Sequence, residues 1–286
     1  FELDNSQQWV INPINMSAHS MTGHYQLMML PISTMQNLDR AMKGANIGVE
    51  RMVISCLATA EASLLQDEKD YGVCLLDIGA GTTNLAVYLD GRLALTKTYA
   101  VGGEHVTRDI AAVLQTTTEE AERIKILHGC VHMNVVKPDH MLHVQGIEGP
   151  QTISRIELSE IIIARYEQIL NTIRNDLDET GAIHGLYHGV VLTGDACQIE
   201  GMVSLVRRML GISAHLGNPP VQVYADEPYL ASLRRSQYAT AAGLLMFSQG
   251  DPQETLVETV DPETLSFWKR AGRAWSGLND KLKSIF

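Results

Sequence analysis

The segment from residue 71 to residue 100 constrains the fold more than any other part of the chain. Its first apolar run, 71–77 (YGVCLLD), predicts a buried strand that ends at a glycine-rich turn. Two further runs, 83–89 (TNLAVYL) and 92–100 (RLALTKTYA), are separated by Asp90-Gly91. An Asp-Gly pair between alternating apolar runs is typical of a β-hairpin. We therefore expect at least three strands of one sheet here.

Segments with helical periodicity precede and follow these strands in the sequence, and this alternation predicts an α/β protein. Further strands are expected at 24–30, 51–56 and 188–193, with short strands between 129 and 157. Helices are expected at 33–45, 57–66, 103–115, 118–128, 158–180, 200–210 and 229–247. No run of eighteen apolar residues occurs, so we expect no transmembrane helix.

The charge of the chain is unevenly distributed. The net charge is −11, but residues 266–286 carry five basic residues against one acid, while the remainder carries 17 basic and 32 acidic residues. An acidic body argues against nucleic acid as a partner. The four cysteines form no C-x-x-C pair and are expected to be reduced core thiols. The histidines match no zinc pattern, so no metal site is expected.

The turn after the first strand has the composition of a phosphate-binding loop. In DIGAGTTNLAVY, the strand delivers Asp77 to its end, Gly79 and Gly81 form the turn, and Thr82 and Thr83 begin the next strand. Glycines let backbone N–H groups point at an anion, and a carboxylate beside phosphates suits Mg²⁺. The alternative is a glycine-rich hairpin with a surface aspartate.

A second glycine turn lies about 115 residues further along the chain. In VVLTGDACQIEG (190–201), a β-branched strand meets Gly194 and then a helical segment. Gly194 would let the chain pass close under a ligand, and a helix N-terminus favours negative charge.

Two features between these turns extend the candidate site. Gly102 and Gly103 follow a strand and allow another close backbone approach. In AERIK (121–125), Glu122 and Lys125 share one helix face and could reach ribose hydroxyls and a base edge. The alternative for Glu122 and Lys125 is an exposed i,i+3 ion pair.

The C-terminal segment predicts an amphipathic helix. Residues 251–264 are acidic and proline-containing, which indicates a flexible linker. On a helical wheel the following apolar residues fall within an arc of about 120°. They are Phe267, Trp268, Ala271, Ala274, Trp275, Leu278, Leu282, Ile285 and Phe286, and the remaining arc carries Lys269, Arg270, Arg273, Lys281 and Lys283. This pattern favours a helix lying in a lipid interface, with packing on the body or on a partner helix as the alternative.

Taken together, these motifs resemble the actin/Hsp70/sugar-kinase ATPase superfamily. DIGAGTTNLAVY resembles its second phosphate loop, VVLTGDACQIEG its adenosine loop, and Gly102-Gly103 with AERIK its ribose and base contacts. The resemblance implies a two-domain, ribonuclease-H-like fold that binds ATP or ADP with Mg²⁺. The implied nucleotide contacts are Asp77, Gly79, Gly81, Thr82, Thr83, Gly102, Gly103, Glu122, Lys125, Gly194, Asp195 and Ala196.

Three stretches are similar to the bacterial cell-division family FtsA. They are AERIKILHGC, the QIEGM that continues the adenosine loop, and the tail with its FWKR and KLKSIF ends. The implied subdivision is 1–31 (end of an inserted SHS2-like subdomain 1C), 32–66 (later part of 1A), 67–112 with 185–250 (2A), 113–184 (2B), linker 251–264 and membrane helix 265–286. On this alignment the first phosphate loop precedes residue 1, so we expect an N-terminally truncated member. Position 195 is an aspartate in this chain, whereas the adenosine loop of the family usually has a second glycine there.

The resemblance implies a cytoplasmic protein that is peripherally bound to the inner membrane at the division site. Its implied function is to tie FtsZ to anionic lipid, with weak or no ATPase activity. The implied partners are the FtsZ C-terminal peptide on 113–184, other division proteins and further copies of the chain in filaments. Arg123, Lys125 and Arg174 are candidate electrostatic contacts for the peptide. Two alternatives are an ATP-consuming enzyme of the same fold and the related pilus-assembly adaptor family.

Overall fold

The computed structural model describes residues 1–4, 10, 13–23, 31–137, 139–219 and 235–249. The expected strand at 24–30, the linker 251–264 and the amphipathic helix 265–286 lie outside the described residues.

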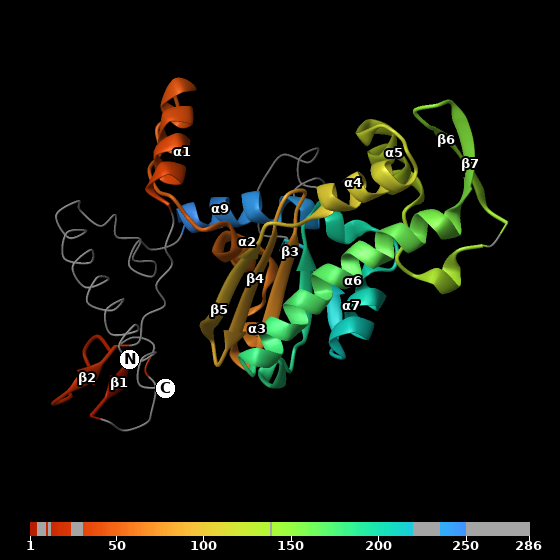
Figure 1. The fold of residues 1–286 in the computed structure, drawn as a ribbon. Coiled ribbons are helices and arrows are strands. Elements are labelled where there is room, and N and C mark those ends of the chain that lie inside the picture. Colours follow the sequence, from red (N-terminus) through yellow and green to blue (C-terminus); the bar gives the residue numbers. More distant parts are fainter. Residues whose placement is uncertain (5–9, 11–12, 24–30, 138, 220–234, 250–286) are drawn as a thin grey trace, which may run out of the picture. The chain divides into compact units, whose positions relative to one another are not determined.

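A five-stranded mixed sheet forms the centre of the fold, in the order β5-β4-β3-β8-β9 (Figure 1). The strands are β3 (Val73–Ile78), β4 (Thr83–Leu89), β5 (Arg92–Tyr99), β8 (Val190–Thr193) and β9 (Ala214–Leu216). β3, β4 and β5 pair antiparallel, whereas β8 and β9 continue the sheet parallel to β3. Asp90 and Gly91 both have positive φ, at 51° and 72°, as a tight hairpin turn requires. The hairpin prediction is confirmed.

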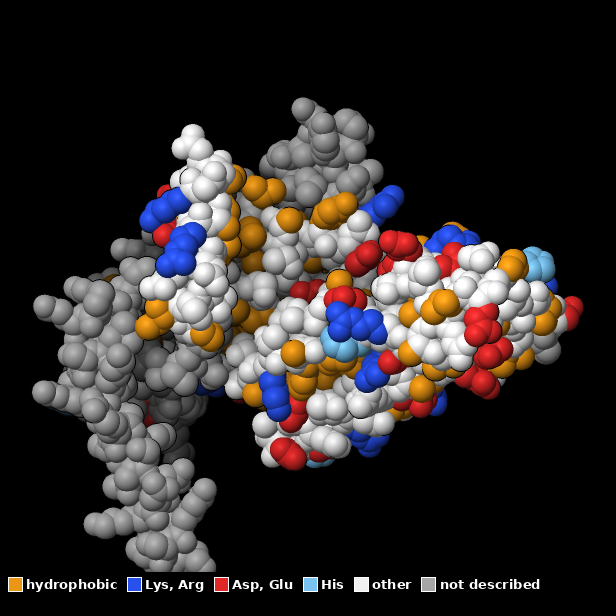
Figure 2. Space-filling model, turned by 45° about the horizontal axis from the view of Figure 1, so that its top comes forward, with side chains coloured by type: hydrophobic (Ala, Val, Ile, Leu, Met, Phe, Trp, Pro, Cys, Tyr) orange, Lys and Arg blue, Asp and Glu red, His pale blue; other side chains and the backbone are white. Residues whose placement is uncertain are grey.

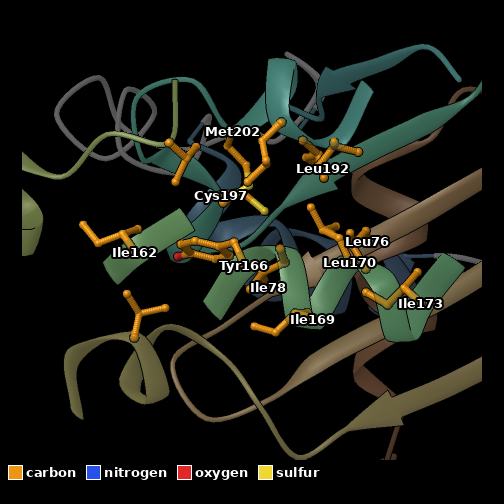
Figure 3. Packing of buried hydrophobic residues seen from close by; sticks show 14 of the residues in the cluster. Leu76, Ile78, Ile162, Tyr166, Ile169, Leu170, Ile173, Leu192, Cys197 and Met202 are labelled. Carbon is orange, nitrogen blue, oxygen red and sulfur yellow. The ribbon is translucent and has the colours of Figure 1, made fainter. Parts of the chain in front are cut away.

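One face of the sheet carries the larger core. Cys74, Leu76 and Ile78 alternate along β3 toward this face, as the two-residue period of a strand requires. They pack against α6 (Arg155–Glu179), which buries one stripe of apolar residues, and the core also includes residues of α4 (Gly103–Val113), α5 (Thr118–His128) and α7 (Met202–Leu210). Figure 3 shows Tyr166, Leu170 and Ile173 of α6 facing this core. The four expected helices in this region are confirmed.

Side-chain caps fix the first residues of α5 and α6. The Thr117 hydroxyl accepts a hydrogen bond from the Glu120 amide at 3.2 Å, and the Ser154 hydroxyl accepts one from the Glu157 amide at 3.1 Å. Such caps satisfy amides that have no partner within the helix. They set where α5 and α6 begin.

The opposite face of the sheet packs against small residues. Val73 and Leu75 of β3 point to this face and meet α2 (Ser55–Ser63), with α3 (Gln66–Tyr71) following it. α9 (Ala239–Gln249) lies along α2. A Cβ at Gly243 would stand 1.7 Å from the Ala58 carbonyl oxygen, so only glycine allows this approach. Helices therefore cover both faces of the sheet.

Smaller elements complete the described chain. The pair β6 (Met141–Gln145) and β7 (Pro150–Ser154) forms a separate antiparallel hairpin, and β1 (Glu2–Leu3) pairs with β2 (Met21–Thr22). α1 (Ile32–Gly44) has no buried residue. The short 3₁₀ helices are η1 (Met133–Val135), η2 (Ala182–Gly185), η3 (Asp195–Gln198) and η4 (Ser236–Tyr238). Residues Val49–Val53 belong to a second unit, separate from Phe1–Gly48 with Ile54–Gln249.

Three sequence expectations need correction. The segment 51–56 is not a strand: residues 51–54 are irregular and α2 begins at Ser55, because no described strand pairs with this β-branched run. The expected helix 57–66 ends at Ser63, since the Glu68 carboxylate accepts a hydrogen bond from the Leu65 amide and starts α3. Residues 229–234 of the helix expected at 229–247 lie outside the described residues, and in its described part 236–238 form the 3₁₀ helix η4 before α9 begins at Ala239.

All four cysteines are buried and free, as expected from their spacing. Over the described residues, no group of three His, Cys, Asp or Glu side chains is arranged to hold a metal ion. Within the same part of the chain, no helix is long and apolar enough to cross a membrane.

Candidate functional site

A cavity of about 1070 Å³ opens beside the carboxyl ends of the central strands. Its wall comes from the glycine turn, the first turns of α4, the length of α5, the start and the middle of α6, and the segment 195–200. Five of the expected site residues line it: Gly103, Glu122, Lys125, Asp195 and Ala196. The other expected residues adjoin it: Asp77 lies near the end of β3, Thr83 begins β4, and Gly79, Gly81, Thr82, Gly102 and Gly194 lie in the turns.

The N-terminus of α4 holds the glycine turn in place. The Gly103 amide donates to the Gly79 carbonyl oxygen at 2.9 Å, and the Glu104 amide donates to the Ala80 carbonyl oxygen at 2.8 Å. A Cβ at Gly102 would lie 2.4 Å from the Gly79 carbonyl oxygen, so a side chain has no room there. The first amides of α4 therefore bind the turn itself and are not left pointing into the cavity.

The strand ends beside the turn bring Asp77 and Gly194 together. Asp77 is the register partner of Thr193 across the parallel β3–β8 pair, so both strands deliver their next residue to the same edge. Gly194 has a φ of +89°, and a Cβ there would come within 2.8 Å of the Asp77 carboxylate. Burial raises the pKa of Asp77, while Asn84 and Thr193 act in the opposite direction.

The two threonines and Gly81 occupy different environments. The Thr83 side chain is buried, and its hydroxyl donates to the Val101 carbonyl oxygen at 2.8 Å. Thr82 and Gly81 are exposed at the tip of the turn, and a Cβ at Gly81 would meet no atom within 4 Å. The tip residues thus remain open to a ligand, whereas the Thr83 hydroxyl is already used inside the fold.

Glu122 and Lys125 form an ion pair on the cavity wall, with 2.7 Å between the Lys125 Nζ and the Glu122 Oε2. The Lys125 ammonium also donates to the Gly103 carbonyl oxygen at 3.1 Å and to the Thr107 hydroxyl at 2.8 Å. The Thr107 hydroxyl contacts the Glu122 carboxylate as well. Burial raises the pKa of Glu122, but Lys125 and Thr107 lower it more, so the net shift is downward.

Three further residues join the site without a local sequence signal. The buried Tyr166 phenol donates to the Ala196 carbonyl oxygen at 3.1 Å and so fixes the 194–198 turn on α6. Arg155 pairs with Glu200 at 2.6 Å and donates to the His128 carbonyl oxygen at 2.8 Å. Tyr166 and Ala196 are 30 residues apart in the sequence, and Arg155 and Glu200 are 45 residues apart. In the sequence, Tyr166 lies among apolar residues at helical spacing, and this pattern predicts only a buried core position.

The cations expected to contact a partner are already paired. Arg123 binds Glu120 at 2.6 Å, and Arg174 lies 3.6 Å from Asp178 and donates to the Met209 carbonyl oxygen. Figure 2 shows such basic and acidic side chains interspersed over one face of the molecule. Lys125 is the most enclosed of the three, with 13% of its side chain exposed against 47% for Arg123 and 49% for Arg174.

Solved structures with the same architecture define the class of fold. MreB5 of Spiroplasma citri bound to ADP aligns with a TM-score of 0.60 and 17% identity, covering 77% of this chain and 66% of that chain. A PilM–PilN type IV pilus biogenesis complex aligns with a TM-score of 0.58 and 19% identity, over 76% and 58% of the two chains. The chain has the fold of actin-like ATPases.

The family follows from sequence comparison. The model of the family "Cell division protein FtsA" matches residues 74–243. FtsA of Escherichia coli K12 is 33% identical over 256 residues, covering 85% of this chain, and FtsA of Bacillus subtilis is 35% identical over 216 residues. The chain belongs to the FtsA family of cell-division proteins. It spans 59% and 47% of the lengths of these two relatives.

Proposed function

We propose that this chain is a non-enzymatic division adaptor that ties FtsZ to the cytoplasmic face of the inner membrane under the control of a bound nucleotide. The observation that carries the proposal is the family match over 74–243, which contains every element of the cavity. The amphipathic pattern of 265–286 supplies the lipid-binding element. The same family match favours a role in division over the pilus-assembly alternative.

The proposed nucleotide is ATP or ADP with Mg²⁺, held between 77–83 and 194–197. The cavity volume of about 1070 Å³ is slightly above the upper limit of about 1,000 Å³ that is usual for small-molecule sites. The phosphates would lie at the tip of the glycine turn, near Gly81 and Thr82, and the adenosine would lie toward α5. Glu122, with its lowered pKa, is an acceptor for ribose hydroxyls.

The residues present fit a magnesium ion. Asp77 offers a carboxylate at the edge where β3 and β8 end, and Asp195 lines the cavity with an exposed carboxylate. Carboxylates next to phosphates repel them unless a cation intervenes. Mg²⁺ would supply the charge neutralisation that lets Asp77, Asp195 and the phosphates share one site.

The proposed protein partners are the FtsZ C-terminal peptide, other division proteins and further copies of the chain. Residues 113–184 hold eleven acidic and six basic residues, so an acidic peptide meets net negative charge there. Arg123 and Arg174 are half-exposed but already paired with Glu120 and Asp178, and Lys137 in the same range is exposed. Apolar contact must supply the rest of the affinity.

One reconstitution tests the adaptor. FtsZ filaments, anionic vesicles and this chain are sedimented together, and FtsZ should appear with the vesicles only when the chain is present. FtsZ that stays in solution with vesicle-bound chain contradicts the adaptor role. A steady-state ATPase assay on the same sample distinguishes the enzyme alternative, which requires sustained phosphate release.

A further inference from the structure

Asp195 lies where the two glycine turns approach each other. The Ala196 Cβ is 3.1 Å from the point that a Cβ at Gly103 would occupy, and the Gly79 carbonyl oxygen is 3.7 Å from the same point. The turn 79–82 and the turn 194–198 therefore meet at Gly103. Asp195 directly precedes Ala196, is exposed and lines the cavity. A charge at position 195 is thus close to the turn where the phosphates are proposed to lie.

The carboxylate of Asp195 is oriented by a neutral side chain. Gln198 Nε2 donates to Asp195 Oδ1 at 3.4 Å and to Gln237 Oε1 at 2.9 Å. A side-chain amide has two N–H donors but carries no net charge. These hydrogen bonds therefore orient the carboxylate without neutralising it.

The cavity wall as a whole is acidic. It carries five acidic side chains and two basic ones, a net charge of −3 when all are ionised. Both basic side chains are paired with acids of the same wall, Lys125 with Glu122 at 2.7 Å and Arg155 with Glu200 at 2.6 Å. The remaining carboxylates, Asp195 among them, are in excess over the cations that line the cavity.

An acidic wall opposes a ligand in proportion to the negative charge that the ligand brings. The repulsion between like charges increases as their distance falls, so the carboxylate nearest the phosphates has the largest effect. A divalent cation bound with the phosphates offsets part of this repulsion.

We infer that Asp195 is a specificity-determining residue that selects against ligand charge. It weakens the binding of ATP more than that of ADP, leaves adenosine unaffected, and makes the binding of polyphosphates depend on a divalent cation. This inference rests on the proposed nucleotide site.

The test compares the full chain with Asp195→Asn, which removes the charge and keeps a side-chain oxygen that can accept from Gln198. Without divalent cations, ATP affinity should rise by about tenfold, ADP affinity should rise by less, and adenosine affinity should stay within about twofold. With excess Mg²⁺ the gain for ATP should shrink to about threefold or less, because the metal complex carries less negative charge. Calorimetric titration measures all the affinities. The expected change is a gain, so a variant that fails to fold cannot imitate it.

Two controls separate charge from shape and from distant electrostatics. Asp195→Glu keeps the charge, so its ATP affinity should stay within about twofold of the wild type. Asp90→Asn removes an 83%-exposed carboxylate at the far end of β4 from the glycine turn. The seven residues of β4 span about 20 Å, well beyond the screening length of about 8 Å, so this variant should leave all three affinities unchanged.

The remaining outcomes decide against the inference or against the site. Equal gains for ATP and adenosine would show that the asparagine acts through shape and not through charge, which overturns the inference. A loss of ATP affinity in Mg²⁺ would make Asp195 a ligand of the metal and overturns it as well. Unchanged ATP affinity in a variant that still binds adenosine refutes the inference alone. If neither the wild type nor Asp195→Asn binds adenosine, ADP or ATP, the proposed nucleotide site is wrong and the inference is wrong with it.

Discussion

The phenol of Tyr166 donates a hydrogen bond to the carbonyl oxygen of Ala196 at 3.1 Å, from the middle of α6 to the second glycine turn. Tyr166 is 1% exposed, and burial raises the pKa of its phenol well above the ordinary value, so it donates at every physiological pH. The contact makes the position of 194–198 depend on a helix that is far away in sequence.

Tyr166→Phe should lower the free energy of unfolding by about 1 kcal/mol, because the ring still packs but the Ala196 carbonyl group loses its donor. ATP affinity should fall with it, since the turn is no longer fixed. Urea denaturation and an ATP titration measure the two effects. Tyr187→Phe is the matched control, because Tyr187 is 81% exposed and should show neither change.

Gly102→Ala should destabilise the chain by about 2 kcal/mol or more, as overpacking against fixed atoms does. The new methyl group would stand 2.4 Å from the Gly79 carbonyl oxygen and 2.6 Å from that of Ala80. Thermal unfolding measures the loss. Gly81→Ala, in the same turn but with open space around it, should unfold like the wild type, and equal loss in both variants would contradict the steric argument.

Gly81→Asp should retain the fold but lose ATP affinity by about tenfold or more, because it places a carboxylate beside the proposed phosphates. A fluorescent-ATP titration measures the affinity, and circular dichroism verifies the fold. Gly81→Ala again serves as the control for the side chain itself. Unchanged affinity in Gly81→Asp would remove the turn from the nucleotide site.

Asp176→Asn should destabilise the chain at neutral pH and have little effect in acid. Hydrogen bonds from Lys97 and Tyr99 lower the pKa of Asp176. A carboxyl group with a lowered folded-state pKa stabilises the fold above its unfolded pKa, and this contribution disappears as the pH falls through the folded value. The effect is at most about 1 kcal/mol, because Lys97 is half-exposed.

Urea denaturation at pH 7 and pH 3 checks this dependence. Asp178→Asn is the control, since Asp178 is half-exposed and lies 3.6 Å from its partner Arg174. A destabilisation of Asp176→Asn that is the same at both pH values would show that packing, not charge, is responsible.

Replacing Trp268 and Trp275 by Glu should release the chain from anionic vesicles and leave the body folded. The two indoles fall about 20° apart on the helical wheel, so they would enter the interface together, and buried apolar area contributes about 25 cal/mol per Å². Lys281→Glu with Lys283→Glu should weaken binding more at low salt than at high salt, since exposed charges are screened. Vesicle sedimentation measures both.

Tyr187→Glu is the control for each single Trp→Glu replacement, because it places one negative charge on an exposed aromatic position of the body. It should sediment like the wild type. If the wild type does not sediment, or the double Trp variant sediments equally well, the segment is a packing or partner element.

The sequence by itself determined the elements whose signals are local. The hairpin around Asp90-Gly91, the helix that begins at Thr118 and the glycine turns depend on a few neighbouring residues, and their dihedral preferences do not need a tertiary partner. The start of α6 was missed by three residues, because the helix expected from 158 begins at Arg155 behind the Ser154 cap. The motifs around them were sufficient to indicate the family. The segment 51–56 shows the limit, since a β-branched run becomes a strand only where another strand pairs with it.

Only the tertiary structure decided what the site residues contact. From sequence, Lys125 and Glu122 were equivalent candidates on one helix face, but the carbonyl group of Gly103, 22 residues away, draws the ammonium inward. Gly102 looked like a ligand approach, yet the atoms it approaches are the carbonyl oxygens of Gly79 and Ala80 in the glycine turn. Hydrogen-bond donors are satisfied by whichever acceptor the packing of helices and strands brings within about 3 Å, and that is a property of chain topology that no local pattern carries.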